Sequence, residues 1–250
     1  MRHNASSVSF NTSESWVILS SIEQSIKRKI EAVGVPLKDW DIQINYGIKT
    51  GFNDAFIITT EKRDEILAAC VDEDERERTD ALIRPILRGR DIKRYGYDWA
   101  GLWLINTHNG IKGRLERIHI EDYPAVKAHL DQYWDKISTR ADKGDTPYNL
   151  RNCAYLDDFS QPKLFYQDIS QKLSFAPCVD MMFCNNTTYF ISSKSKELLQ
   201  YIASILNTNL MDWYYRKISV QLGNSAVRMF SIYVLKLPIP KHIYTSLYNT

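Results

Sequence analysis

Two hydrophobic periodicities alternate along this sequence, and together they restrict it to a mixed α/β (α+β) fold. Residues 20–33 predict an amphipathic helix, because Ser20 and Glu23 form a capping box and isoleucines recur on one helical face. Residues 42–48 alternate apolar and polar side chains, which is typical of a strand buried on one side. We therefore expect a sheet-rich domain with an N-terminal helix before it and a long C-terminal helix, residues 198–214, after it.

Shorter patterns indicate the elements between these two helices. The loop Gly47–Gly51 leads from the first strand into an apolar triplet, and Asn185-Asn186 is typical of a hairpin turn. For both glycines we favour turn geometry over a functional role. Further helices are expected at 61–80 and 124–137, and further strands at 56–58, 101–107, 163–169, 178–184, 187–191 and 232–239.

Charge and hydropathy limit the classes of function. The 250 residues carry 32 Lys and Arg against 30 Asp and Glu, so any electrostatic site must be local. No stretch reaches the roughly 18 consecutive apolar residues of a membrane span. The N-terminal residues lack the apolar core of a signal peptide. We expect a cytoplasmic protein with a disordered or leader segment (1–12), one domain (13–241) and a C-terminal tail (242–250).

The sequence contains no recognisable catalytic, cofactor-binding or metal-binding motif. Its four cysteines and five histidines show no metal-ligand spacing, so we expect neither a metal nor disulfides. Phosphate-binding glycine loops and the GxSxG elbow are missing. So are the Asn-Pro-Pro-Tyr tetrapeptide of amino-methylating DNA methyltransferases and the Glu-x-Lys of a common restriction nuclease. We expect no catalytic residue and no cofactor in this chain.

The most unusual segment is basic. Five Lys or Arg and one acid lie between Arg84 and Arg94, next to a glycine and Tyr95. Clustered arginines suit DNA, because a guanidinium attracts phosphates and can pair in bidentate fashion with guanine. On charge alone, a solvated basic turn offset by the acids of 72–80 is the simpler interpretation.

Several runs, taken in order, resemble the TaqI-like C-terminal specificity domain, the target-recognition part of adenine-specific DNA methyltransferases and type IIG restriction enzymes. The resemblance extends over about residues 13–241. It begins with Trp40–Ile58 and Pro85–Tyr95. The further runs are Leu104–Gly110, Arg140–Tyr148, Lys163–Ser170, Asn186–Ile191, Leu206–Leu210, Leu222–Arg228 and Leu237–Pro240.

The resemblance implies a division of labour between domains. A domain upstream, or one supplied in trans, would bind S-adenosylmethionine and carry the methyltransferase or nuclease chemistry. This chain would dock on double-stranded DNA and select the sequence, without a cofactor of its own. The DNA-contacting residues that we expect from the basic patch and the glycine loop are Lys49, Arg88, Arg90, Lys93 and Arg94.

A second expected contact surface is the polar stretch 140–151. It combines cations for phosphates with an amide and a tyrosine for base edges, around a Gly-Asp-Thr-Pro turn. We expect Arg140, Lys143 and Arg151 to face DNA together with the Arg88–Arg94 patch. An ordinary surface loop that holds the backbone in place is the alternative.

Two other functions stay open at this point. The first is a protein-interaction or specificity-subunit scaffold whose basic patch is incidental. The second is an enzyme with an unrecognised centre, for which Asp168 and Asp180 are the candidate carboxylates. The simpler interpretation of each carboxylate is a pair with a nearby Arg or a backbone amide.

Overall fold

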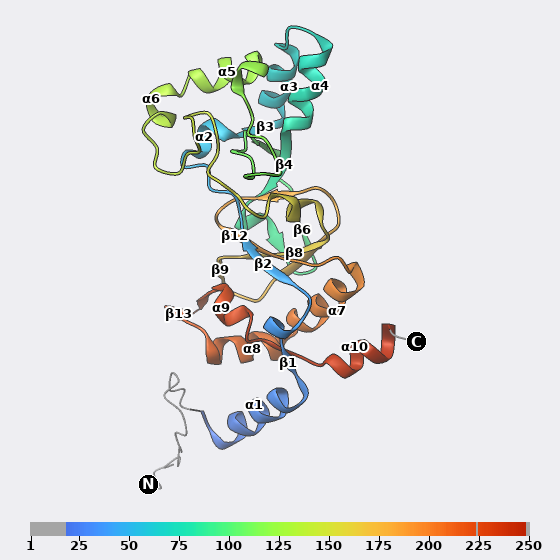
Figure 1. Cartoon of the computed structure of the whole chain (residues 1–250). Helices are drawn as coiled ribbons and strands as arrows, with labels where there is room; N and C mark the ends of the chain where they lie inside the picture. Colours follow the sequence, from blue (N-terminus) through green and yellow to red (C-terminus); the bar gives the residue numbers. More distant parts are fainter. Residues whose placement is uncertain (1–18, 224, 249–250) are drawn as a thin grey trace.

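The computed structural model describes residues 19–223 and 225–248, so the expected leader 1–12 lies outside the described residues. The molecule is elongated and has three levels (Figure 1): an upper lobe, a central sheet and a lower helical layer. The two ends of the domain lie side by side in the lower layer. No helix within the described part of the chain is long and apolar enough to cross a membrane.

The upper lobe is built on a four-stranded sheet in the order β11-β4-β7-β3. β11 and β4 are parallel, and the other pairs are antiparallel. Its strands are β3 (Ile57–Thr59), β4 (Ile83–Leu87), β7 (Leu102–Ile105) and β11 (Phe183–Cys184). Its helices are α2 (Asn53–Phe56), α3 (Thr60–Ala68), α4 (Glu73–Leu82), α5 (Pro124–Asp131) and α6 (Trp134–Ile137).

The central sheet is antiparallel, in the order β10-β8-β12-β2, and its inner strands β8 and β12 are buried on both faces. Successive residues of β8 alternate between two cores: Phe165 joins the core of the upper lobe, whereas Leu164 and Tyr166 join the core of the lower layer. In β12, Phe190 and Ile191 divide in the same way. The strands are β2 (Gln43–Tyr46), β8 (Lys163–Gln167), β10 (Phe175–Cys178) and β12 (Thr188–Ser192).

The lower layer packs helices against the central sheet and joins the two ends of the domain. β1 (Val35–Pro36) pairs with β15 (Pro238–Ile239), so the segment after α1 lies beside the segment before α10. The helices are α1 (Ser21–Val33), α7 (Lys196–Leu206), α8 (Asn209–Ile218), α9 (Ser231–Val234) and α10 (Lys241–Tyr248). Short strands are β5 (Ile92–Lys93), β6 (Gly96–Tyr97), β9 (Ile169–Ser170), β13 (Gln221–Leu222) and β14 (Ala226–Arg228).

The mixed α/β class and the N-terminal helix are confirmed. α1 has the expected capping box, in which Ser20 accepts from the Glu23 amide and Glu23 accepts from the Ser20 amide. Each of the expected long helices at 61–80, 124–137 and 198–214 is divided into two shorter ones. In the last case the break falls at Asn207, whose side chain bonds both the N–H and the C=O of Phe175 on the edge strand β10.

Two strand predictions are wrong. Asn185-Asn186 does form a turn, but the segments on its two sides belong to different sheets: β11 pairs with β4, and β12 pairs with β2 and β8. The expected strand 232–239 is mostly the short helix α9, and only Pro238–Ile239 is extended. The expected tail 242–250 contains most of α10.

Gly47 allows the end of β2 to approach β11 closely. A Cβ placed on Gly47 would lie 2.0 Å from the carbonyl oxygen of Asn185 and 2.5 Å from that of Cys184. Because both neighbours are backbone atoms, they cannot rotate away. The Gly47 N–H also donates to the carbonyl of Thr188, so this contact ties the glycine loop to the Asn185 turn.

We predict that Gly47→Ala lowers the free energy of unfolding by about 2 kcal/mol or more, because the added methyl group overpacks a backbone contact. Gly96→Ala is the matched control, since no atom lies within 4 Å of the place that a Cβ on Gly96 would take. Urea denaturation of both variants measures the difference. Equal stability of the two variants would contradict the close approach.

A buried histidine predicts acid sensitivity. His129 on α5 is buried, its Nε2–H donates to the Ala55 carbonyl at 3.0 Å, and burial lowers its pKa below 6.5. In acid the unfolded chain therefore binds more protons than the folded chain. The contribution of neutral, buried His129 to the free energy of unfolding is complete above about pH 6.5 and is lost as pH falls through the lowered pKa.

We predict that the free energy of unfolding decreases between about pH 7.5 and pH 5.5, and that His129→Gln shows a smaller decrease than the wild type. His119→Gln, at an exposed histidine, serves as the control that removes a histidine without touching the buried one. Urea denaturation at both pH values is the measurement. An identical pH dependence in His129→Gln and wild type would exclude this role of His129.

Candidate nucleic-acid interface

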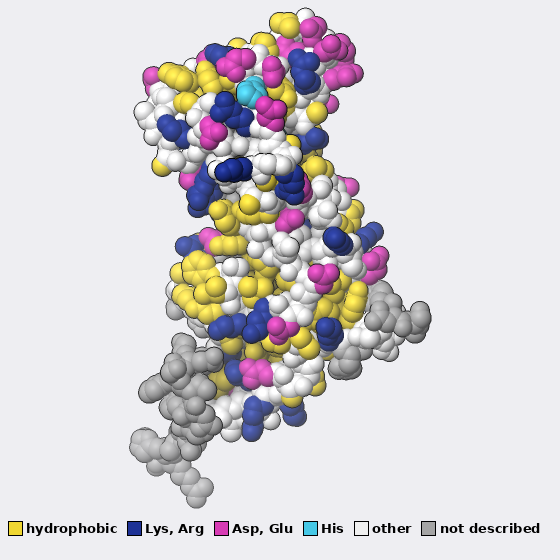
Figure 2. All heavy atoms as spheres, in the orientation of Figure 1, with side chains coloured by type: hydrophobic (Ala, Val, Ile, Leu, Met, Phe, Trp, Pro, Cys, Tyr) yellow, Lys and Arg dark blue, Asp and Glu magenta, His cyan; other side chains and the backbone are white. Residues whose placement is uncertain are grey.

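Five loops between the upper lobe and the central sheet are linked to one another by direct contacts, and we call this group of loops the waist. They include most of the polar and basic runs that the sequence singled out. The five loops are Gly47–Gly51, Arg88–Asp91, His108–Ile118, Arg140–Arg151 and Asn185–Thr188. Figure 2 shows several Lys and Arg side chains between the upper lobe and the central sheet, whereas Asp and Glu gather over α3 and α4 at the top of the molecule.

Arg140 fastens two of these loops together. Its side chain is buried, and Nη1 donates to the carbonyls of Thr50, at 2.6 Å, and Asp142. Nη2 donates to the carbonyls of Pro147 and Asn149, at 3.0 and 2.7 Å. Burial lowers the pKa of Arg140 to about 10, so the guanidinium is still charged at neutral pH. One side chain thus satisfies four carbonyls of two loops.

The prediction that Arg140 faces DNA is therefore wrong. Its donors point inward, and its guanidinium lies 4.5 Å from the centroid of the buried Phe56 ring. Arg140 instead follows the alternative interpretation of the stretch 140–151, in which the loop holds the backbone in place. The other two cations of the loop stay at the surface. Lys143 is exposed and donates to the Ser138 carbonyl, and Arg151 forms an ion pair with Asp142 at 3.0 Å.

The turn Asn185–Thr188 lies between two glycine loops. Gly47 packs on the carbonyl of Asn185, and Gly89 packs on Thr187, whose hydroxyl accepts from the Gly89 N–H at 2.8 Å. Gln167 at the end of β8 donates to the Gly89 carbonyl at 2.7 Å. These contacts hold the backbone near Lys49 and Arg90 on the two sides of one turn.

The basic patch divides into fixed and free cations. Arg88 binds the buried carboxylate of Asp91 with Nε and Nη2, at 3.0 and 2.8 Å. Arg94 donates to the Asn207 carbonyl, and Lys93 lies 3.8 Å from Asp98. Arg88 thus pairs with Asp91, and not with the acids of 72–80. Both Arg88 and Arg94 hold the fold together through these contacts.

Arg90 and Lys49 keep their charges available. Arg90 is exposed, and its side chain has no hydrogen-bond or ion-pair partner among the described residues. The Lys49 ammonium lies 5.3 Å from the Tyr46 ring centroid and has no acidic partner in the described part of the chain. A positive side chain that is ordered at its base and free at its tip is suited to phosphate contact.

The sequence interpretation missed a third basic loop. Lys112, Arg114 and Arg117 lie on the segment 108–118, directly after the run Leu104–Gly110 that carried part of the resemblance. The signal was present, because Gly110–Arg117 holds three bases and two glycines within eight residues. This loop reaches the Arg140–Arg151 loop through Asn109, which donates to Asp145 at 3.0 Å and also to Asn152.

The two candidate carboxylates do not form a centre. Asp168 follows β8 and accepts from Arg228 Nη1 at 2.8 Å, so it is an ion-paired residue. Asp180 contributes its backbone carbonyl to Lys163, at the opposite end of β8. Five strand residues separate these ends by roughly 15 Å. Within the described residues, no group of three or more His, Cys, Asp or Glu is placed to hold a metal ion.

We predict that Arg140→Lys lowers the free energy of unfolding by about 3 kcal/mol, because a lysine keeps the charge but cannot satisfy four carbonyls that lie on different sides of a guanidinium. Lys143→Ala, in the same loop but exposed, should change stability by less than about 0.5 kcal/mol. Denaturation curves of both variants measure this. A variant Arg140→Lys with wild-type stability would contradict the fastening role.

Comparison with known proteins identifies the family. The family described as the TaqI-like C-terminal specificity domain matches residues 84–239. Since this is more than half of the chain, the protein belongs to that family. A curated relative is the type II methyltransferase M.PaeR7I of Pseudomonas aeruginosa, which is 21% identical over 236 residues. That match covers 92% of this chain and 38% of the relative.

Two solved structures share the fold. The type IIL restriction-modification enzyme MmeI, solved in complex with DNA, aligns with a TM-score of 0.57 and 15% identity over 80% of this chain and 25% of that chain. The type IIG restriction endonuclease BpuSI aligns with a TM-score of 0.52 and 14% identity over 86% of this chain and 26% of that chain. The chain thus spans about a quarter of each of these structures.

Proposed function

We propose that this chain is the DNA target-recognition module of a restriction-modification methyltransferase or type IIG enzyme. It binds double-stranded DNA and contributes sequence preference. The S-adenosylmethionine site and the methyltransferase or nuclease chemistry belong to another domain, either upstream on the same polypeptide or supplied in trans. This chain itself uses no cofactor or metal.

The observation that carries the proposal is the convergence of separate sequence runs on the waist. Glycines, amides and the buried Arg140 fix the backbones of these loops through contacts between distant parts of the chain. Lys49, Arg90 and Lys112, which have no acidic partner among the described residues, lie on three of these loops. A rigid base with free polar tips is what recognition of a nucleic acid requires.

The membership in the specificity-domain family and the nature of the relatives support the same conclusion. The curated relative is named as a type II methyltransferase, and one structural neighbour was solved with DNA. The charge distribution fits as well. The acids over α3 and α4 would be repelled by phosphates, so the duplex would approach the waist and leave the top of the upper lobe in solvent (Figure 2).

We predict that the chain binds duplex DNA with a strong salt dependence. Lys49→Ala/Arg90→Ala should weaken this binding and should reduce the slope of log K against log salt by about 2 units. Arg28→Ala/Lys29→Ala, on exposed positions of α1 in the lower layer, removes the same charge and is the control. Fluorescence anisotropy of labelled duplex at several salt concentrations is the measurement.

Two outcomes would decide against the proposal. Absence of duplex binding by the wild type at low salt would favour the protein-interaction scaffold. Equal slopes for Lys49→Ala/Arg90→Ala and for the α1 control would remove the waist from the DNA interface, because the two variants differ only in where the charges are lost.

A further inference from the structure

Residues His108–Ile118 form a small hairpin with an isolated antiparallel bridge between Ile111 and Leu115. The stem is closed by the bond from the Ile118 N–H to the His108 carbonyl, at 3.0 Å. Nearer the tip, Ile111 and Leu115 exchange two backbone hydrogen bonds of 2.8 and 2.9 Å. Positive φ angles at Gly110 and Gly113, 71° and 76°, allow these bends. All residues from 112 to 116 are exposed.

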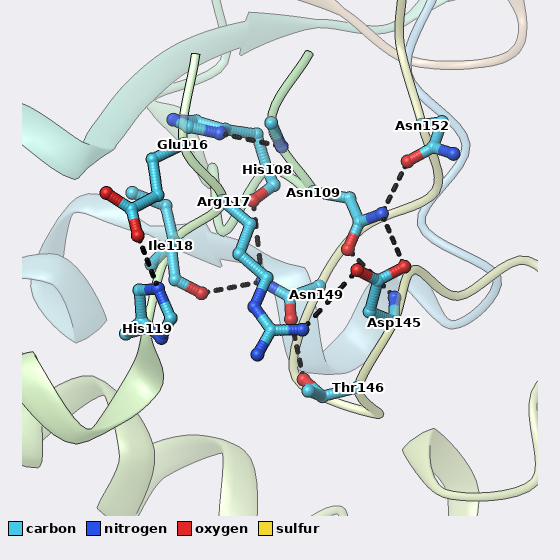
Figure 3. Close-up of polar contacts among 11 residues, drawn as sticks. His108, Asn109, Glu116, Arg117, Ile118, His119, Asp145, Thr146, Asn149 and Asn152 are labelled. Atoms are coloured by element: carbon cyan, nitrogen blue, oxygen red, sulfur yellow. Dashed lines mark hydrogen bonds and ion pairs between the residues drawn. The ribbon is translucent and has the colours of Figure 1, made fainter. Parts of the chain in front are cut away.

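The base of the hairpin is rigid. Asn149 is buried, and its Nδ2 donates to the carbonyls of both stem residues, Ile118 at 2.8 Å and His108 at 3.4 Å (Figure 3). Asn109 is held from the other side by Asp145, whose N–H donates to its Oδ1 at 2.8 Å. The side-chain amides of Asn109 and Asn149 are thus engaged within the protein, so they are not free to contact DNA.

His108 adds to this rigidity. Its Nδ1 accepts a hydrogen bond from the Gly110 N–H at 3.2 Å, so this nitrogen must be unprotonated. Burial lowers the pKa of His108, which keeps the ring neutral at physiological pH. The first residue of the stem and the first glycine of the bend are therefore fixed relative to one another.

The side chains of the tip, by contrast, are exposed. Lys112 has no hydrogen-bond or ion-pair partner in the described part of the chain. Arg114 pairs with Asp157 at 2.8 Å, but both side chains are more than half exposed, so water and a DNA phosphate or base can replace this partner at little cost. Leu115 exposes 38% of its surface beside these cations.

We propose that the tip of this hairpin enters a groove of duplex DNA and contacts base edges there, so that Lys112 and Arg114 contribute to the choice of sequence. This inference rests on the proposed function. The major groove is about 12 Å wide and admits a two-stranded ribbon, which fits a hairpin of this size. Arg and Lys donate to guanine O6 and N7, and an apolar side chain such as Leu115 can pack on the thymine methyl group.

The hairpin is suited to base edges, whereas the loops of Lys49 and Arg90 are suited to phosphates. Those two cations lie beside the Asn185–Thr188 turn, close to the sheet, where they can reach a phosphate at the rim of a groove. The hairpin tip, residues 112–116, is exposed throughout and carries apolar as well as polar surface. A hollow of about 860 Å³ is lined mainly by the hairpin itself, residues 109–117, and on its other wall by Asp145 and residues 152–154, so Lys112 and Arg114 border an open, accessible space.

The test is selection from a library of randomised duplexes, because the recognised sequence does not have to be known in advance. Wild-type protein, Lys112→Ala/Arg114→Ala and Lys49→Ala/Arg90→Ala are each incubated with the library, and the bound duplexes are sequenced. We expect the hairpin variant to lose preference at one or more positions of the enriched motif, by about tenfold or more. The comparison variant should enrich the wild-type motif with weaker overall binding.

The possible failures are distinguishable. If the hairpin variant enriches the wild-type motif with the same preference at every position, the base-reading role of the tip is overturned while the proposed function stands. If wild type enriches no motif and binds no duplex, the proposed function fails and this inference fails with it. Both tip side chains are exposed, so a melting temperature within a few degrees of wild type shows that the variant is folded.

Discussion

The whole structure depends on a central sheet whose inner strands are buried on both faces. Phe165 and Phe190 pack upward with Phe159 and Phe183 in the upper core, and Tyr166 and Ile191 pack downward against the lower helices. Because side chains alternate along a strand, the inner strands β8 and β12 carry apolar side chains toward both cores, whereas the edge strand β2 alternates apolar and polar residues. The central sheet therefore sets the distance between the upper lobe and the lower layer, and the waist loops lie where it meets the upper lobe.

Local chemistry made part of this fold predictable. The capping box of α1, the alternation in β2 and the apolar runs at 163–167 and 188–191 all correspond to observed elements. The errors come from contacts over long sequence separations. Asn207 ends α7 because its side chain bonds the edge of β10, and the Asn185 turn separates two sheets because β11 pairs with β4. No local pattern contains that information.

The candidate site shows the same limit. Residue type and resemblance singled out loops that contact one another in the fold, and the DNA contacts that they predict for Lys49 and Arg90 stay predictions. They could not reveal that Arg140 turns inward to four carbonyls, or that Arg88 is engaged by Asp91, because the partners are set by the tertiary fold. The hairpin 108–118 was detectable from its glycines and bases, yet its rigid stem depends on Asn149, more than thirty residues away.

Amide hydrogen exchange with and without duplex DNA tests most directly whether the waist is the DNA-binding surface. We predict added protection in the Gly47–Gly51, Arg88–Asp91 and Asn185–Thr188 loops and in the 108–118 hairpin, with little change in α1, α3 and α4. Protection confined to α3 and α4 or to the lower helices, with unchanged exchange in the waist loops, would contradict it.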